Sequence, residues 1–437
     1  MISTLLRSLM LVGTIGFGGG SALIPIIERE LVDRRKLLRE TQYARHTIVA
    51  NITPGALPVK LAASAGVTVG GPIVAVLAAF VVALPGVVGT LALIALSDFL
   101  GPNAVHVVSS ASVGITIFIV VLLLGYIMKV HANAGNELLL FVVITAVAAI
   151  LTGSGPILRV LASAIGHDMT WKPPQIDAVT LILGSLVLIA LFSAIRARGR
   201  DPISPIPEPT PTSALQPALR ACVAFVVVTL VGVATFAMLN PNGLRIGALI
   251  ALSSITSFGG GEAYIAVADG YFVQPGYVDA GTFYTQLVPI ANALPGPILV
   301  KVAAGIGYLT GASTGPAASW LLALAATIVS AGACCALAMP VLGAYVTMRR
   351  NPIVVGIGRY ILPVICGLLV SVSATMLEVS TEVGRRAGIA PPVMLIVAVV
   401  AIAVMTCLHL RKVVPDLVML LTAGAVSLLI IELLSRT

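Results

Sequence analysis

Long apolar stretches dominate the pattern of hydrophobic and polar positions along the chain. An α-helix needs about 20 apolar residues to cross the hydrocarbon core of a bilayer, and stretches near that length recur along the whole sequence. They cover residues 73–97, 107–128, 138–152, 176–195, 221–239, 316–345, 361–377, 391–408 and 416–434. The short alternating strands typical of a membrane β-barrel are not the pattern here. We therefore expect an all-α polytopic membrane protein with roughly nine spans.

A polar passage broken by glycine and proline interrupts this pattern twice, and the two copies lie 241 positions apart. Each copy begins with a glycine cluster, continues to a Pro-Gly pair and ends at a lysine. The matched positions are Phe17-Gly18-Gly19-Gly20 and Phe258-Gly259-Gly260-Gly261, Pro54-Gly55 and Pro295-Gly296, Lys60 and Lys301, Asn51 and Asn292, Gly66 and Gly307, Gly70 and Gly311, and Pro174 and Pro415. Two equivalent halves with broken helices are typical of transporters built from structural repeats.

A Pro-rich, basic segment separates the two halves. We assign residues 1–195 to the first repeat, 196–218 to an extended and solvated cytoplasmic linker, and 219–437 to the second repeat. The second repeat begins with an additional apolar span, 221–239. Because one additional crossing reverses the direction of everything that follows, we expect the two repeats to have inverted topology.

The distribution of basic residues supports this orientation. The loop 28–45 contains six Lys or Arg residues, whereas the equivalent loop 269–283 contains none. Since cytoplasmic loops of membrane proteins are enriched in Lys and Arg, the first loop is expected inside and the second outside. The bias is strongest if both glycine-broken passages are re-entrant, entering and leaving the membrane on one side. The net charge of +8 therefore indicates loop sidedness rather than nucleic-acid binding.

The Pro-Gly pairs with their lysines are the strongest candidate for a binding site. Proline and glycine end one helical arm, and the next arm then begins with free backbone N–H groups and a partial positive charge. Lys60 and Lys301 stand near the first turn of that next arm. N–H donors together with one full positive charge suit an oxyanion. The alternative is that each lysine extends to the membrane interface and the Pro-Gly pair is an ordinary kink.

Three further features belong to the same passages, and each has an alternative interpretation. The clusters Gly18–Gly20 and Gly259–Gly261 would cup an anion with backbone N–H groups, or allow close packing of helices. Asn51 and Asn292 would donate amide N–H groups to a ligand, or bond neighbouring helices. Glu262, where the first copy has Ser21, would carry a coupling proton, or lie at the external mouth.

Several classes of protein are disfavoured by the sequence. The five cysteines lie in apolar stretches, and the five histidines are scattered without metal-ligand spacing. There is no phosphate-binding loop of the Walker type, so an ATP-driven pump is not expected. We expect no cofactor and no metal. An intramembrane enzyme would need an acid–base pair that the sequence does not offer, which leaves a secondary transporter as the main hypothesis and a passive anion channel as an alternative.

The motifs in both halves resemble the chromate ion transporter family in its long, two-domain form. The first half carries TIGFGGGSALIPIIERELVDRR and TPGALPVKLAASAG, and the second carries SFGGGEAYIAVADGYFV and ALPGPILVKVAAGIGY. The resemblance implies a multi-pass plasma-membrane (inner-membrane) secondary transporter that exports chromate. Uptake or exchange of sulfate or an organic anion is the alternative. The expected partners are the oxyanion and the lipid bilayer, with no nucleic acid; whether the protein forms a homodimer is open.

Overall fold

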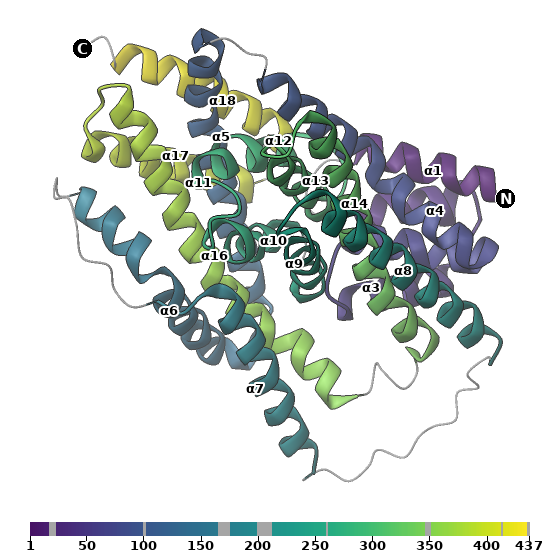
Figure 1. The fold of residues 1–437 in the computed structure, drawn as a ribbon. Helices are drawn as coiled ribbons and strands as arrows, with labels where there is room; N and C mark the ends of the chain where they lie inside the picture. Colours follow the sequence, from purple (N-terminus) through teal and green to yellow (C-terminus); the bar gives the residue numbers. More distant parts are fainter. Residues whose placement is uncertain are drawn as a thin grey trace. The chain divides into compact units, whose positions relative to one another are not determined.

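The computed structural model describes residues 1–16, 23–98, 102–164, 175–198, 212–258, 261–345, 351–411 and 414–434. Every regular element in these ranges is helical (Figure 1). The first half comprises α1 (Ile2–Ile15), α2 (Leu23–Glu28), the π-helical turn η1 (Arg29–Arg34), α3 (Glu40–Ile52), α4 (Leu57–Asp98), α5 (Pro102–Ala132), η2 (Gly135–Glu137), α6 (Leu138–Ala164) and α7 (Ala178–Arg198). This confirms the all-α class expected from the hydropathy pattern.

The second half begins with an additional helix, α8, before the element that matches α1. It comprises α8 (Thr212–Leu239), α9 (Gly243–Thr256), α10 (Gly261–Ala268), η3 (Asp269–Val273), α11 (Ala280–Thr282), η4 (Phe283–Leu287), α12 (Val288–Ala293), α13 (Ile298–Gly311), α14 (Pro316–Gly343), α16 (Pro352–Arg386), α17 (Pro391–Leu410) and α18 (Asp416–Leu434). The elements η3 and η4 are π-helical turns.

Eight helical segments among the described residues are long and apolar enough to cross a membrane. They are Leu57–Leu96, Ser110–Ala132, Gly135–Ala164, Ala178–Ile195, Leu215–Leu239, Pro316–Gly343, Pro352–Arg386 and Pro391–Leu410. The segment Val418–Leu433 is apolar but shorter. The protein is thus a multi-pass membrane protein with close to the number of spans that the apolar stretches indicate.

The helix ends of the two halves coincide at the spacing of 241 positions. Helices α1 and α9 match at both ends, α3 and α12 end at matched residues, and α4 and α13 begin at matched residues. The reason is local, because the same glycines and prolines interrupt the backbone at the same places. Inversion of one half relative to the other stays a prediction.

Both glycine-broken passages consist of short helical arms. In the first, α2 with η1 spans 23–34 and α3 spans 40–52; in the second, α10 with η3 spans 261–273 and the run from α11 to α12 spans 280–293. At 1.5 Å per residue each arm is about 20 Å long, whereas the hydrocarbon core is about 30 Å thick. Each arm is thus shorter than the core is thick, which is compatible with a re-entrant geometry; that geometry stays a prediction.

The expected linker is shorter than its composition indicated. Helix α7 continues to Arg198 and α8 begins at Thr212, with Pro217 inside its first turns. Residues 196–198 and 212–218 are therefore helical rather than extended. The Ala- and Leu-containing sequence around Pro217 favours helix, and Ala218 packs in a buried position. The centre of the linker, 199–211, lies outside the described residues.

The chain forms two compact units that do not coincide with its two halves. Unit 1 comprises Met1–Leu91, Ile182–Tyr264 and Pro295–Leu362, and unit 2 comprises Ala92–Leu181, Ile265–Leu294 and Pro363–Thr437. Each unit takes segments from both halves. The repeats 1–195 and 219–437 are therefore not two separate compact bodies, because their helices pack with those of the other half.

Unit 1 is held together by close helix packing at small residues. Helix α14 lies along α8 and also packs against α9 and α13 (Figure 1). A Cβ atom on Gly232 of α8 would lie 2.6 Å from Cγ2 of Val329, and one on Gly307 of α13 would collide with the backbone of Leu322. Small residues let backbones approach in this way, and the approach favours helix association in a bilayer.

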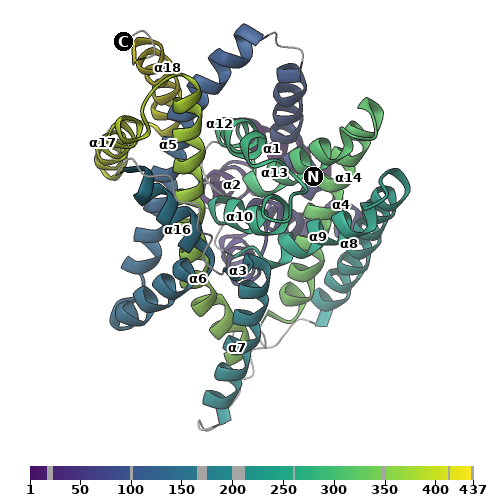
Figure 2. The same cartoon turned by 60° about the vertical axis from the view of Figure 1, so that its left-hand side comes forward.

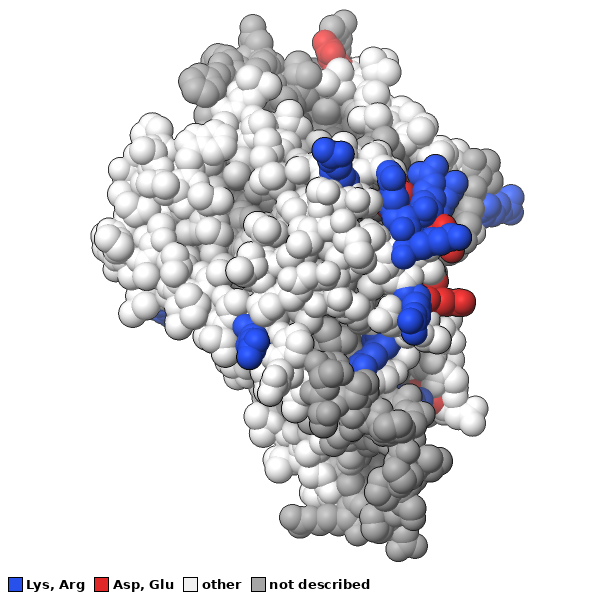
Figure 3. Space-filling model, turned by 90° about the vertical axis from the view of Figure 1, so that its right-hand side faces the viewer, with Lys and Arg blue, Asp and Glu red and all other residues white. Residues whose placement is uncertain are grey.

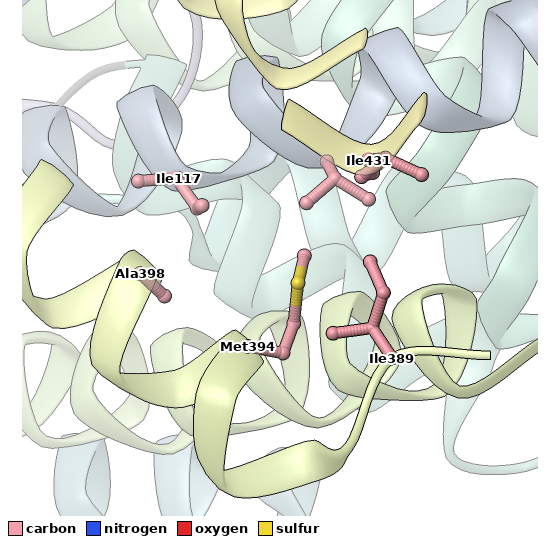
Figure 4. Close-up of a cluster of buried hydrophobic side chains, with 6 residues drawn as sticks. Ile117, Ile389, Met394, Ala398 and Ile431 are labelled. Atoms are coloured by element: carbon pink, nitrogen blue, oxygen red, sulfur yellow. The ribbon is translucent and has the colours of Figure 1, made fainter. Parts of the chain in front are cut away.

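Unit 2 has its own apolar core between α5, α17 and α18, which lie close together in Figure 2. One cluster of buried side chains joins α5 and α18 to α17 and to the turn before it (Figure 4). It consists of Val113, Ile117, Ile389, Met394, Ala398 and Ile431. Since the cluster includes residues from both halves of the sequence, it joins them within this unit.

Candidate functional site

The two Pro-Gly breaks have the backbone conformation that their sequences predict. Helix α3 ends at Ile52, and α12 ends at Ala293. Gly55 has φ of 102° and Gly296 has φ of 96°, a region that residues with a Cβ atom rarely adopt. The next helices begin at Leu57 and Ile298. Each break therefore separates the end of one helix from the start of the next.

Each break is hydrogen-bonded to the opposite half of the chain. The N–H of Gly55 donates to the carbonyl oxygen of Ser257 at 2.6 Å, just after α9. The N–H of Gly296 donates to the carbonyl oxygen of Gly16 at 3.0 Å, just after α1. Gly16 and Ser257 are themselves 241 positions apart. The two hydrogen bonds are thus reciprocal, and both lie within unit 1.

The packing around the breaks is reciprocal as well. A Cβ atom on Gly55 would collide with Cys334 of α14 and approach the carbonyl oxygen of Ser254 at 3.3 Å. A Cβ atom on Gly296 would lie 3.5 Å from the carbonyl oxygen of Gly13. Gly13 and Ser254 again differ by 241 positions. Each half therefore supplies the helix end against which the other half's break is seated.

Lys60 is buried, with 1% of its surface exposed, and its ammonium group holds the first break. Nζ donates to the carbonyl oxygens of Ala50 at 2.6 Å, Thr53 at 2.5 Å and Pro54 at 3.1 Å, and contacts Oγ1 of Thr53 at 3.2 Å. These are the carbonyl groups at the C-terminal end of α3, where a positive charge is favoured. An ammonium group has three protons to donate.

This geometry changes the role that the sequence indicated for Lys60. Its protons are all directed at backbone oxygens, so it does not present a free donor to a ligand in this conformation. It also does not extend to the membrane interface, because the side chain is buried. Its charge nevertheless lies between the end of α3 and the start of α4, where it raises the local positive potential.

Lys301 is the matched residue of the second break and is fully buried, with 0% exposure. A Cβ atom on Gly86 of α4 would lie 2.9 Å from Cδ of Lys301, so the lysine stem runs closely over this glycine. A Cβ atom on Gly86 would also collide with the carbonyl oxygen of Pro295, and one on Gly296 would lie 3.6 Å from Cα of Gly86. Helix α4 of the first half thus covers the second break and its lysine.

The starts of α4 and α13 direct backbone N–H groups towards the breaks. The first intrahelical hydrogen bonds are donated by the N–H groups of Lys60, to Ala56 at 3.1 Å, and Lys301, to Pro297 at 3.3 Å. The preceding residues of both helices are buried. A helix start offers N–H donors and a partial positive charge, and the adjacent lysine adds a full one. Chemically, such an arrangement suits an anion with several oxygen atoms.

The two asparagines form matched bonds of a kind that the sequence did not predict. Nδ2 of Asn51 donates to the carbonyl oxygen of Thr47 at 2.8 Å, and Nδ2 of Asn292 donates to that of Val288 at 2.8 Å. Both acceptors lie four residues earlier in the same helix. These bonds serve neither a ligand nor a neighbouring helix, because each amide turns back along its own backbone.

The glycine clusters are described only in part. Gly18, Gly19 and Gly20 lie outside the described residues, as do Gly259 and Gly260. Gly261 begins α10, and a Cβ atom there would lie 2.7 Å from Cβ of Ile298. The second cluster therefore ends against the first residue of α13. Glu262 lies in α10, but its side chain lies outside the description.

Buried Glu30 is a residue that the sequence analysis did not single out. It is 4% exposed and accepts hydrogen bonds from Ser8 Oγ at 3.1 Å, Arg35 Nε at 3.0 Å and Arg34 Nη1 at 3.4 Å. Burial by itself raises the pKa of Glu30, but the bonds from Arg35, Ser8 and Arg34 together hold that pKa below its ordinary value. The sequence signal was a glutamate among arginines, which composition alone assigns to a solvated loop.

The basic side chains of the same loop are mostly exposed. Figure 3 shows Lys and Arg side chains gathered on one part of an otherwise largely uncharged surface. The exposed members of the loop 28–45 are Arg29, Arg34, Arg35, Lys36 and Arg39. Among the described residues, no group of three or more His, Cys, Asp or Glu side chains forms a metal-binding cluster.

These features define a class: an α-helical, multi-pass membrane protein whose helices are broken in pairs around buried lysines. The chain belongs to the chromate transporter family, because the family's model, described as "Chromate transporter", matches residues 3–167 and 244–428, more than half of the chain. The two matched regions fall in the two halves. The family to which the chain belongs is a transporter family, not an enzyme family.

Two curated relatives are similar to parts of the chain. The "Uncharacterized transporter YwrB" of Bacillus subtilis (strain 168) is 31% identical over 93 residues, which are 21% of this chain and 47% of the relative. The "Uncharacterized transporter YwrA" of the same organism is 32% identical over 119 residues, or 27% of this chain and 62% of the relative. The chain thus aligns with about half of one relative's length and under two thirds of the other's. No solved structure matches the chain.

Proposed function

We propose that the protein is a secondary transporter that exports chromate, or an oxyanion of similar shape and charge, across the plasma membrane. The ion would bind at a central site to which both repeats contribute. Membership of the chromate transporter family supports the substrate class. The direction of transport, the membrane and the binding residues are part of the proposal.

The reciprocal seating of the two Pro-Gly breaks is the observation that carries this proposal. Gly55 is bonded to the second half and Gly296 to the first, within one compact unit that also buries Lys60 and Lys301. A movement of either helix end must disturb the opposite break. Transporters with discontinuous helices place their binding sites at such breaks, where repeats meet.

The proposed mechanism uses backbone N–H groups as ligands and the lysines as fixed charges. An oxyanion loses most of its hydration on entering the membrane, so it needs donors and positive charge to replace the water. The starts of α4 and α13 supply donors, and Lys60 and Lys301 supply charge. Because Lys60 also holds the carbonyl end of α3, an arriving anion would weaken those bonds and loosen the break. Binding would thereby be linked to the movement that opens the other side.

Flux into inverted membrane vesicles tests the proposal. Radiolabelled chromate and sulfate would be offered to vesicles containing the wild-type protein, Lys60→Met, Lys301→Met or Lys129→Met. Lys129 is an exposed lysine in the last turn of α5 and serves as the matched control. We expect chromate uptake by wild type and Lys129→Met, and a loss of about tenfold or more in the two buried-lysine variants.

Two results would count against the proposal. Absence of chromate and sulfate flux in wild-type vesicles would remove the substrate class. Normal flux in a protein carrying both Lys60→Met and Lys301→Met would remove the site. A preference for sulfate, or flux only in right-side-out vesicles, would favour uptake or exchange of another anion. Chromate flux that stays the same when no ion gradient drives it would indicate a channel.

A further inference from the structure

Unit 2 contains a buried carboxyl group that the proposed anion site does not use. Asp269, the first residue of η3, is 4% exposed. Its Oδ1 accepts a hydrogen bond from the hydroxyl of Tyr284 at 2.6 Å, and its Oδ2 accepts one from Nε2 of Gln274 at 2.7 Å. Tyr284 is fully buried. In the described part of the chain, Asp269 forms no ion pair with Lys, Arg or His.

The first half carries an acid and a tyrosine at the matched positions, but their side chains have different contacts. Tyr43 and Tyr284 are 241 positions apart, as are Glu28 and Asp269. Tyr43, however, donates its hydroxyl to the backbone oxygen of Ile24 at 2.5 Å rather than to a carboxylate. Glu28 is only partly buried. The acid and the tyrosine are thus present in both halves, but only the second half buries the acid against the tyrosine.

The surroundings of Asp269 hold this pair without neutralising it. Tyr284 is the titratable group that touches the carboxyl, and its own carbonyl oxygen accepts a hydrogen bond from Thr116 of α5 at 3.2 Å. Next to Asp269, Gly270 lies so close to Ala178 of α7 that a Cβ atom there would collide with it. Asp177, the charged residue at the start of α7, is exposed and bonded to Thr180.

From this geometry, and resting on the proposed function, we propose that Asp269 and Tyr284 form the proton-binding site through which oxyanion transport is coupled to proton movement. A buried carboxylate without a cation is costly in a membrane protein, and such residues commonly mark ion or proton pathways. Both carboxylate oxygens accept hydrogen bonds here. Each oxygen keeps a second lone pair that can take a proton, and protonation removes the charge that strengthens the bonds from Gln274 and Tyr284, so it weakens the contact between η3 and η4.

The position of the pair in the chain connects it to the second break. Residues 265–294 of unit 2 continue at one end into α10, which begins at Gly261 of the second glycine cluster. At the other end they continue into Pro295-Gly296. The π-helical turns η3 and η4 carry Asp269 and Tyr284, and π-helical turns are frequent at functional sites. A change between these turns is transmitted along the backbone to both ends of the passage.

The test is the movement of protons that accompanies transport in proteoliposomes. An internal pH-sensitive dye would report protons while radiolabelled chromate reports substrate, at pH values between about 5.5 and 8.5. Asp269→Asn keeps the size of the side chain and removes the titratable group. Glu28→Gln, at the matched position of the first half, and Asp279→Asn, which changes an exposed carboxylate of the same loop, are the controls.

We expect wild type, Glu28→Gln and Asp279→Asn to move protons with chromate. Asp269→Asn should lose that proton movement by about tenfold or more while it still exchanges labelled for unlabelled chromate. Tyr284→Phe, which keeps the carboxyl but removes one donor to its charged form, should shift the pH profile of transport to higher pH. Tyr43→Phe should leave the profile in place.

Each contrary result has a distinct meaning. Proton movement that is unchanged in Asp269→Asn, or lost only in Glu262→Gln, would overturn the assignment of the proton to Asp269. Loss of exchange together with proton movement in Asp269→Asn, with an unshifted profile in Tyr284→Phe, would assign the pair a structural role and likewise overturn it. Absence of chromate exchange in wild type would instead refute the proposed function on which the inference rests.

Discussion

The backbone N–H of Gly55 lies 2.6 Å from the carbonyl oxygen of Ser257, although one residue belongs to the first half of the chain and the other to the second. The same relation recurs between Gly296 and Gly16. One such bond fastens each broken passage to the opposite half. Each break is therefore seated against the end of a helix from the other half.

Replacing the break glycines with alanine should have unequal effects on stability. Both Gly55→Ala and Gly296→Ala force a Cβ atom into a positive-φ conformation, which costs about 1 kcal/mol. Only Gly55→Ala also places that atom onto Cys334, which adds about 1–3 kcal/mol by overpacking. Gly71 has φ of 82° and no atom within 4 Å of its Cβ position, so Gly71→Ala measures the cost of the positive φ alone.

Thermal unfolding in detergent, followed by fluorescence-detected size exclusion, measures the three glycine variants. We expect Gly71→Ala and Gly296→Ala to have similar apparent melting temperatures and Gly55→Ala to have a lower one. If Gly55→Ala unfolded at the same temperature as the other two variants, the close packing of position 55 against Cys334 would be absent in the detergent-solubilised protein.

Lys60→Met should destabilise the protein as well as reduce its transport. The substitution leaves the carbonyl oxygens of Ala50, Thr53 and Pro54 without their ammonium donor, and each buried acceptor left unpaired costs about 1–3 kcal/mol. Lys129→Met, which removes an exposed charge, should change the melting temperature little. A Lys60→Met protein as stable as Lys129→Met would show that water or another group satisfies these carbonyls.

Lys60→Arg should restore stability and transport only in part. The guanidinium group is planar and larger, whereas the compact ammonium of Lys60 is surrounded by oxygens from one helix end. The relevant measurement is chromate flux per correctly folded molecule, compared with wild type and Lys60→Met. Full restoration would show that positive charge alone is needed at this position.

Glu30 should make the protein sensitive to acid. Because its folded-state pKa lies below the ordinary value, its bonds to Ser8, Arg34 and Arg35 contribute stability above the unfolded-state pKa of about 4.3. That contribution is lost as the pH falls through the lower folded-state value. Glu30→Gln should therefore be less stable than wild type at neutral pH and approach it in acid, whereas Glu28→Gln should follow wild type. Parallel curves for wild type and Glu30→Gln would refute this.

The loops at the ends of the two passages should face opposite sides of the membrane. Single cysteines at Thr41 and Pro275, both exposed, would be placed in a protein without Cys222, Cys334, Cys335, Cys366 and Cys407. In intact cells an impermeant thiol reagent should label the cysteine at position 275 and not that at 41, because the charge distribution predicts that the basic loop 28–45 is cytoplasmic. Labelling of both from one side would contradict the inverted arrangement.

Local features of the sequence were sufficient for the class and for the positions of the breaks. Long apolar stretches predict spanning helices because a helix alone satisfies its backbone in lipid. Proline and glycine act on their own backbone, so helix starts at Leu57 and Ile298 follow from Pro-Gly pairs just before them. The same reasoning overextended the linker, because α8 includes Pro217 in spite of the backbone hydrogen bond that a proline removes.

Partners distant in the chain were decided only by the tertiary structure. The sequence placed Lys60 beside a break but not against the carbonyl groups of α3, because the path of its flexible stem depends on how the helices around it pack. It showed an acid and a tyrosine in both passages, Glu28 with Tyr43 and Asp269 with Tyr284, yet not which acid is buried. Burial and charge pairing arise from contacts between segments that are remote in sequence. The periodicity of apolar residues does not predict which segments make these contacts.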